Sequence, residues 1–273
     1  MSPRHAIAIL AIAATTGLAD DPLQTKDEAR PKRLELMREQ AAATKVVVEA
    51  DEKRIEPELV AEPLMRYDDQ PRRFVDATLW LWTHEKRPVA VCKVEDDRRI
   101  PGKPAWQWCL SSLAGSRVAV TWPNGQSWES RAAIEYRVIP DGPVPADSPR
   151  LRLTQMKALA RRFSAVMIIL QDRQSMRLLP TPIHRYEAPN GGVRDAALFA
   201  VTANGLNPDC IVIIELVRAD TEQAVWRYAV APVTADAMEL QLDNQTVWTK
   251  QSTLRVGGDT VYHFTEPNPN AVE

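Results

Sequence analysis

Two stretches of the chain carry apolar residues at steps of three and four, which is the period of an amphipathic helix. The clearer stretch runs from residue 153 to 166 and follows Ser148-Pro149, which offers a cap with a proline early in the helix. A weaker stretch from residue 34 to 44 follows Pro31. The pattern therefore predicts one helix in each half of the chain.

After each predicted helix, the pattern changes to runs of strand-forming residues bounded by turn residues. The expected strands are residues 77–83, 89–95, 105–110, 118–122 and 134–139 in the first half and 197–202, 209–217, 224–231, 238–242 and 254–264 in the second. One helix followed by about five antiparallel strands is an α+β layer, with the helix packed on one face of the sheet. This order is similar to that of cystatin-like and NTF2-like folds, in which a curved sheet wraps a helix.

The two halves also match residue by residue. Residues 63–68 (PLMRYD) correspond to residues 182–187 (PIHRYE). A nearly constant spacing continues in the pairs Glu95 and Glu215, Trp106 and Trp226, and Trp128 and Trp248. This predicts a tandem duplication of a helix plus antiparallel sheet unit. The alternative is two unrelated β-rich stretches that share common turn chemistry.

The first residues have the pattern of a secretory signal peptide. A basic start at Arg4-His5 precedes an uncharged apolar run at residues 6–14, and small residues precede a cut after Ala19. The run is too short to span a bilayer, and the alternative is a buried N-terminal core helix. We expect an exported protein of the periplasm or the extracellular space, with no transmembrane segment in the mature chain.

These patterns together predict the domain organisation. It consists of a signal peptide (1–19), a flexible N-terminus (20–31), repeat unit 1 (32–139), a proline-rich linker (140–149), repeat unit 2 (150–265) and a tail (266–273). The prolines of the linker are typical of a semi-rigid connection.

Composition and short motifs narrow the classes of function. With 34 Lys and Arg against 36 Asp and Glu, the formal net charge is −2, and we expect no nucleic-acid partner. The chain contains no Gly-x-Ser-x-Gly elbow, no Cys-x-x-Cys spacing and no glycine-rich phosphate loop. We therefore predict no cofactor and no metal site.

The cysteines leave two alternatives open. Cys92 and Cys109 flank a turn-like stretch around Ile100-Pro101-Gly102, and a symmetric hairpin would place them opposite each other. An oxidising compartment would permit a disulfide between them. The alternative, which we favour, is that both are small apolar packing residues in strands.

Several motifs stand together in the second half and, in part, in the first. They are residues 177–180 (RLLP), the Pro-x-x-Arg-Tyr box, the Asp-Ala-x-Leu-Phe/Trp strand and the later tryptophans. Together they resemble a family of uncharacterised exported proteins of planctomycete-type bacteria. The most specific part, residues 177–186, is weaker in the first half, where residues 60–62 (VAE) replace the Leu-Leu-Pro part. The resemblance implies export and a shared fold, and it carries no activity.

Two Arg-Tyr pairs, each with an aspartate ten residues after the arginine, form the most suggestive constellation: Arg66-Tyr67 with Asp76, and Arg185-Tyr186 with Asp195. In a functional interpretation, each arginine presents its planar fork to a carboxylate or sulfate ligand. In a structural interpretation, it pairs with the aspartate across a hairpin, and the tyrosine covers it. Presence in both halves favours the structural interpretation, because a ligand site usually needs only one copy.

The first half holds an excess of tryptophans. Trp82, Trp108 and Trp122 have no tryptophan at the corresponding positions of the second half. They could form a flat aromatic platform for sugar rings or a protein. The alternative is a bulkier core in one half.

Two function hypotheses follow. The first is an exported, non-catalytic protein that binds an envelope protein or a polysaccharide. The second is a small-molecule enzyme of the hydrolase or isomerase type, with a cavity between the helix and the curved sheet. Its best catalytic candidate is His184, because the corresponding residue of the first half is Met65.

Overall fold

The computed structural model describes residues 24–50, 53–97, 105–170, 172–218, 224–255 and 258–265. The predicted signal peptide, residues 20–23 of the predicted flexible N-terminus and the predicted tail lie outside the described residues, and residues 24–31 belong to helix α1 instead of a flexible segment. None of the helices in the described part combines the length and apolar character needed to cross a membrane.

Each part of the chain begins with one helix, and strands follow it. The first part of the chain forms α1 (Gln24–Ala43), β1 (Lys45–Ala50), β2 (Lys53–Ile55), β3 (Glu58–Leu59), β4 (Met65–Asp69), the 3₁₀ turn η1 (Gln70–Arg72), β5 (Phe74–His84), β6 (Arg87–Asp97), β7 (Ala105–Ser112), β8 (Arg117–Thr121), β9 (Ser127–Glu129) and β10 (Arg137–Val138). The second part forms α2 (Pro149–Ala160), β11 (Phe163–Ile169), β12 (Asp172–Leu178), β13 (His184–Ala188), η2 (Pro189–Gly191), β14 (Val193–Thr202), β15 (Cys210–Arg218), β16 (Ala224–Pro232), β17 (Ala237–Leu242), β18 (Gln245–Lys250) and β19 (Tyr262–Phe264).

The prediction of an α+β fold is wrong. Strands account for about 55% of the structure and helices for about 15%, and the sheets are large and curled. Strand β5 shows the reason, because Leu79 and Leu81 enter one core while Trp80 and Trp82 enter another. A sheet that is buried on both faces carries a continuous apolar run and has to be covered on each side. The chain is therefore a β-rich protein, and neither a duplicated helix-plus-sheet unit nor a cystatin-like or NTF2-like helix wrapped by one sheet describes it.

The predicted helices are shifted rather than missing. Ser148 caps α2, and its hydroxyl accepts a hydrogen bond from the backbone N–H of Leu151 at 3.2 Å. The helix ends at Ala160, not at residue 166, because residues from Phe163 onward form strand β11. Phe163 and Val166 of this strand happen to continue the three-and-four spacing of the helix. The alternation of buried and less buried residues along β11 is therefore not apparent from the sequence.

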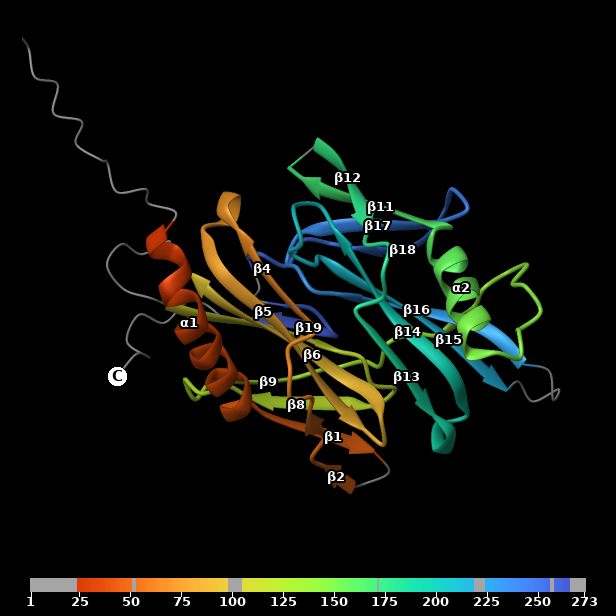
Figure 1. The fold of residues 1–273 in the computed structure, drawn as a ribbon, viewed down its shortest axis with the longest axis horizontal. Helices are drawn as coiled ribbons and strands as arrows, with labels where there is room; N and C mark the ends of the chain where they lie inside the picture. Colours follow the sequence, from red (N-terminus) through yellow and green to blue (C-terminus); the bar gives the residue numbers. More distant parts are fainter. Residues whose placement is uncertain are drawn as a thin grey trace, which may run out of the picture.

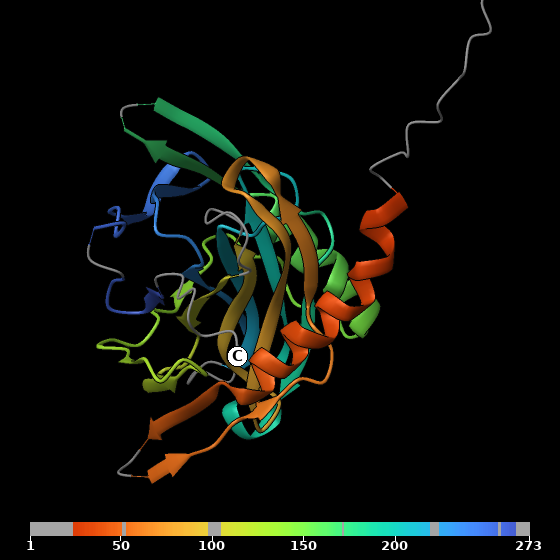
Figure 2. The same ribbon diagram turned by 90° about the vertical axis from the view of Figure 1, so that its left-hand side faces the viewer.

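The described strands form three sheets, and α1 and α2 lie over different long strands (Figure 1). A six-stranded sheet has the order β19-β7-β6-β5-β3, with β4 also on β5; a nine-stranded sheet has the order β10-β16-β15-β14-β12-β11-β17-β18, with β13 on β14. A smaller sheet has the order β2-β1-β8-β9. Figure 2 shows the helices on one side of the long strands and β17 and β18 on the other.

The two large sheets exchange their last strands. Strand β10 follows the first part of the chain but pairs with β16, where Val138 lies opposite Arg227. Strand β19 follows the second part but pairs with β7, where Phe264 lies opposite Cys109. Each part therefore supplies one edge strand to the sheet of the other.

The cores lie between sheets and under the helices. Leu79, Leu81 and Val91 of the six-stranded sheet pack with residues such as Leu198 and Ile213 of the nine-stranded sheet. A second core lies under α1 and a third under α2. These side chains fill most of the space between each helix and its sheet, and a pocket of about 470 Å³ lies beside α1, where Arg33, Arg66 and Asp76 line it.

The predicted linker, residues 140–149, lies against the second part of the chain. The indole N–H of Trp226 donates a hydrogen bond to the carbonyl of Pro143 at 3.0 Å. The side-chain amide of Gln155 donates to the carbonyl of Val144 at 2.7 Å. These contacts place the linker beside β16 and α2.

Candidate functional site

The arginines of the Arg-Tyr pairs are held by aspartates. Arg66 Nε lies 2.8 Å from Asp76 Oδ1, and Arg33 of α1 donates to the other oxygen of the same carboxylate at 3.0 Å. Asp76 is buried, so a charge-assisted pair is needed to compensate its desolvation. The fork of Arg66 is thus engaged in the fold.

The second part of the chain repeats this arrangement. Arg185 Nε lies 2.9 Å from Asp195 Oδ1, and Arg152 of α2 donates to Asp195 Oδ2 at 2.7 Å. Both clamps join the start of a helix to a long strand. The geometry is that of the structural interpretation, in which the arginine pairs with the aspartate across a hairpin.

The tyrosines of the pairs point the other way. Successive residues of a strand face opposite sides of the sheet, so Tyr67 and Tyr186 leave the arginines uncovered. Tyr67 Oη donates to Glu95 Oε1 at 3.1 Å, and Tyr186 Oη donates to Glu215 Oε1 at 2.6 Å. The expectation that each tyrosine covers its arginine is wrong.

The tryptophan candidates belong to the interior. Trp82, Trp108 and Trp122 are 3%, 1% and 2% exposed, and all three pack in the core under α1. An aromatic platform for sugars or a protein needs exposed ring faces, which these residues do not offer. They form the bulkier core of the alternative interpretation.

The cysteines in the described part of the chain are free and buried. Cys92 lies opposite Leu110 and Lys93 lies opposite Cys109, so the hairpin is one residue out of the register that a disulfide requires. Opposite residues share a face and neighbours along a strand do not. Cys92 and Cys109 therefore point to opposite faces of the sheet, and the predicted bridge is wrong.

His184 lies outside the cavity described below. It begins β13, and its ring stacks on Tyr186 with 6.0 Å between ring centroids. Burial lowers the pKa of His184 below its usual value. The stacking places His184 beside Tyr186, the tyrosine that donates to Glu215.

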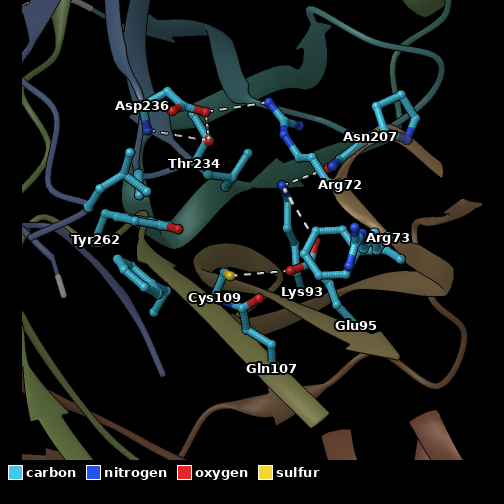
Figure 3. A pocket seen from close by; sticks show the side chains of 16 residues that line it. Arg72, Arg73, Lys93, Glu95, Gln107, Cys109, Asn207, Thr234, Asp236 and Tyr262 are labelled. Carbon is cyan, nitrogen blue, oxygen red and sulfur yellow. Dashed lines mark hydrogen bonds and ion pairs between the residues drawn. The ribbon is translucent and has the colours of Figure 1, made fainter. Parts of the chain in front are cut away.

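A cavity of about 490 Å³ opens where the two parts of the chain meet (Figure 3). Its walls come from η1 and β5, from β6 and β7, from the turn before β15, from the segment between β16 and β17, and from β19. Lys93, Glu95 and Cys109 form one wall, and Tyr262 of the neighbouring strand β19 packs beside Cys109. We call this the Glu95 cavity.

Two buried charges stand on its wall. Lys93 and Glu95 are 3% and 2% exposed, and Lys93 Nζ lies 3.9 Å from Glu95 Oε1, too far for a hydrogen bond. Lys93 Nζ donates to Asn207 Oδ1 at 2.7 Å, and Cys109 Sγ lies 3.5 Å from Glu95 Oε2. Burial raises the pKa of Glu95 above its usual value, although Lys93 and Tyr67 oppose the shift.

A polar network ties this wall to the second part of the chain. The amide of Asn207 donates to Asp69 Oδ2 at 2.8 Å. Arg72 lies within 3.1 Å of both Asp69 and Asp209, and Asp236 Oδ2 lies 3.4 Å from its guanidinium. Burial raises the pKa of Asp209.

The corresponding glutamate of the second part has a different environment. Glu215 is fully buried, and Arg227 Nε donates to its Oε2 at 2.7 Å. Arg87, the first residue of β6, lies 3.2 Å from Oε1. Both guanidinium groups lie over the ring of Tyr136, at 4.4 Å for Arg227 and 5.4 Å for Arg87.

Sequence reasoning missed Lys93, Arg72 and Asn207. One signal was present, because Lys93 and Glu95 interrupt an apolar run that had been assigned to a buried strand. A charge inside such a run needs a compensating group or a wet cavity. Arg72 and Asn207 gave no local signal, because their contacts depend on how the two parts of the chain meet.

No family model matches the chain, and no curated protein or solved structure is significantly similar to it. The resemblance to exported proteins of planctomycete-type bacteria stays a prediction. Within the described residues, no group of three or more His, Cys, Asp or Glu side chains is placed to hold a metal ion. The function is therefore argued from the cavity.

Proposed function

We propose that this protein is an exported, non-catalytic binding protein that holds a small polar ligand in the Glu95 cavity. The observation that carries the proposal is the pair of buried charges, Lys93 and Glu95, on the wall of a cavity of about 490 Å³. That volume falls within the usual range for small-molecule sites.

Buried charges of this kind are costly to the fold. Removing a charged group from water costs several kcal/mol, about as much as a good ion pair returns. Lys93 and Glu95 attract each other across 3.9 Å, but they share no direct hydrogen bond. A ligand that bonds to both groups would supply the missing contacts, which favours binding over a purely structural role.

A screen by thermal shift tests the proposal on the full mature chain. Compounds of three classes (cationic, anionic and neutral polyhydroxylated) are added to the wild type, to Glu95→Gln and to the matched control Glu215→Gln. At least one compound should raise the melting temperature of the wild type and of Glu215→Gln, with the shift lost in Glu95→Gln. The proposal fails if no class shifts the wild type, or if Glu95→Gln responds like the wild type.

An enzyme remains the second candidate, and the raised pKa of Glu95 favours it. A buried carboxyl group with a raised pKa is a better general acid near neutral pH than a carboxyl group in water. The distinguishing measurement is turnover of any compound found in the screen. Conversion by the wild type, and none by Glu95→Gln, would identify a catalyst instead of a binding protein.

A further inference from the structure

The surroundings of Glu215 show which side chains occupy, in the second part of the chain, the place that the Glu95 cavity occupies in the first. Glu215 lies opposite Arg227 in the pairing of β15 with β16, as Glu95 lies opposite Gln107 in the pairing of β6 with β7. Each glutamate accepts a hydrogen bond from the tyrosine of an Arg-Tyr pair. The two positions are thus comparable in register and in their tyrosine donor.

Both guanidinium groups of the Glu215 environment are replaced at the Glu95 cavity. Gln107 stands where Arg227 stands. Asn207 stands directly before a proline in the turn that leads into β15, and Arg87 stands directly before a proline at the first position of β6. Shorter, uncharged side chains at these two positions leave room for the cavity, which both of them line.

The balance of charge changes with these replacements. Around Glu215, the two guanidinium groups of Arg87 and Arg227 face one carboxylate. Around the Glu95 cavity, the described residues place four cations (Arg72, Arg73, Lys93 and Lys250) near five carboxylates (Asp69, Glu95, Asp209, Asp236 and Asp259). Arg72 is engaged by three of these carboxylates, and Arg73 is exposed at the rim. The cavity therefore has room for one more positive charge beside Glu95.

We infer that the Glu95 cavity binds a small cation with a guanidinium group, held against the Glu95 carboxylate as Arg227 is held against Glu215. The inference rests on the proposed function. A planar guanidinium can donate two parallel hydrogen bonds to a carboxylate. Two aromatic residues, Tyr262 and Phe264, also line the cavity.

Isothermal titration calorimetry with agmatine tests the inference, with glutarate as the anionic control probe. Agmatine should bind the wild type and Glu215→Gln. Glu95→Gln should bind it at least about tenfold more weakly, the factor expected for losing a charge-assisted hydrogen bond. Gln107→Arg should also lose binding, because its own guanidinium would then occupy the place beside Glu95. That variant keeps the Glu95 carboxylate, so a loss in both variants does not depend on one of them failing to fold.

The outcomes separate the two claims. Binding of glutarate without binding of agmatine would overturn the guanidinium inference and leave the proposed binding function standing. Agmatine binding that is unchanged in Glu95→Gln and in Gln107→Arg would also overturn the inference. A wild type that binds neither probe, and nothing from the thermal-shift screen, would overturn both.

Discussion

Glu95 and Glu215 occupy comparable places in the two parts of the chain, yet their surroundings differ. Both are buried, and both accept a hydrogen bond from the tyrosine of an Arg-Tyr pair. Glu215 is closed off by two arginines, whereas Glu95 faces a cavity beside a lysine that lies 3.9 Å away. The comparison teaches that a buried carboxylate at this position can have two roles. It forms a structural ion pair where arginines of the protein contact it, and it can line a binding site where a ligand is left to supply the cation.

The largest expected effect comes from removing an arginine beside Glu215, the glutamate that two arginines close off. Arg227→Ala removes one of the two cations that compensate the buried Glu215, and we expect a loss of about 3 kcal/mol in unfolding free energy, near the lower end for a broken buried pair because Arg87 stays. Urea denaturation measures it. The matched control, Gln107→Ala, should lose about 1 kcal/mol or less, and equal losses would contradict the comparison.

A second effect tests a feature that the two parts share. Arg66→Ala and Arg185→Ala should each cost about 2 kcal/mol, because each leaves a buried aspartate with one guanidinium instead of two. Thermal or urea unfolding gives the values. If Arg185→Ala left the melting temperature unchanged yet abolished binding of a ligand, the structural interpretation of these arginines would be wrong.

A third change sharpens the comparison by giving Glu95 an arginine neighbour like the one that Glu215 has. Gln107→Arg places a guanidinium opposite Glu95, and we expect a gain of about 1 kcal/mol, reduced from the usual value by repulsion from Lys93. The matched reverse change, Arg227→Gln, should destabilise. A loss of stability in Gln107→Arg would show that the cavity cannot accept a guanidinium.

The smallest effect concerns pH. The pKa of Glu95 is higher in the folded protein than in the unfolded chain, so ionising it opposes folding. This penalty is absent below the unfolded value of about 4.3, grows as the pH rises through that value, and is complete above the folded pKa. Glu95→Gln removes the penalty, so the variant should gain stability relative to the wild type as the pH rises from about 4 to 7. Urea midpoints across this range measure the difference, and a difference that is independent of pH would contradict the assignment.

The sequence allowed the helices and most long strands to be located, because apolar periodicity is local. It did not reveal that β5 and β14 are covered on both faces, since a continuous apolar run is also compatible with other arrangements. The Arg66–Asp76 and Arg185–Asp195 pairs could be anticipated from their shared spacing. The cavity could not, because Arg72 and Asn207 meet only after the sheets have packed, and the register of β6 on β7 decides that Cys109 shares a face with Lys93.

The exchange of β10 and β19 has a consequence for how the molecule is assembled. The backbone N–H of Trp108 donates a hydrogen bond to the hydroxyl of Thr265, 157 residues further along the chain, so this edge of the six-stranded sheet stays open until β19 has been synthesised. Contacts between residues so distant in sequence slow folding. The exchange also means that a cut between the two parts would not yield two complete sheets, because each fragment would still carry the strand that completes the sheet of the other.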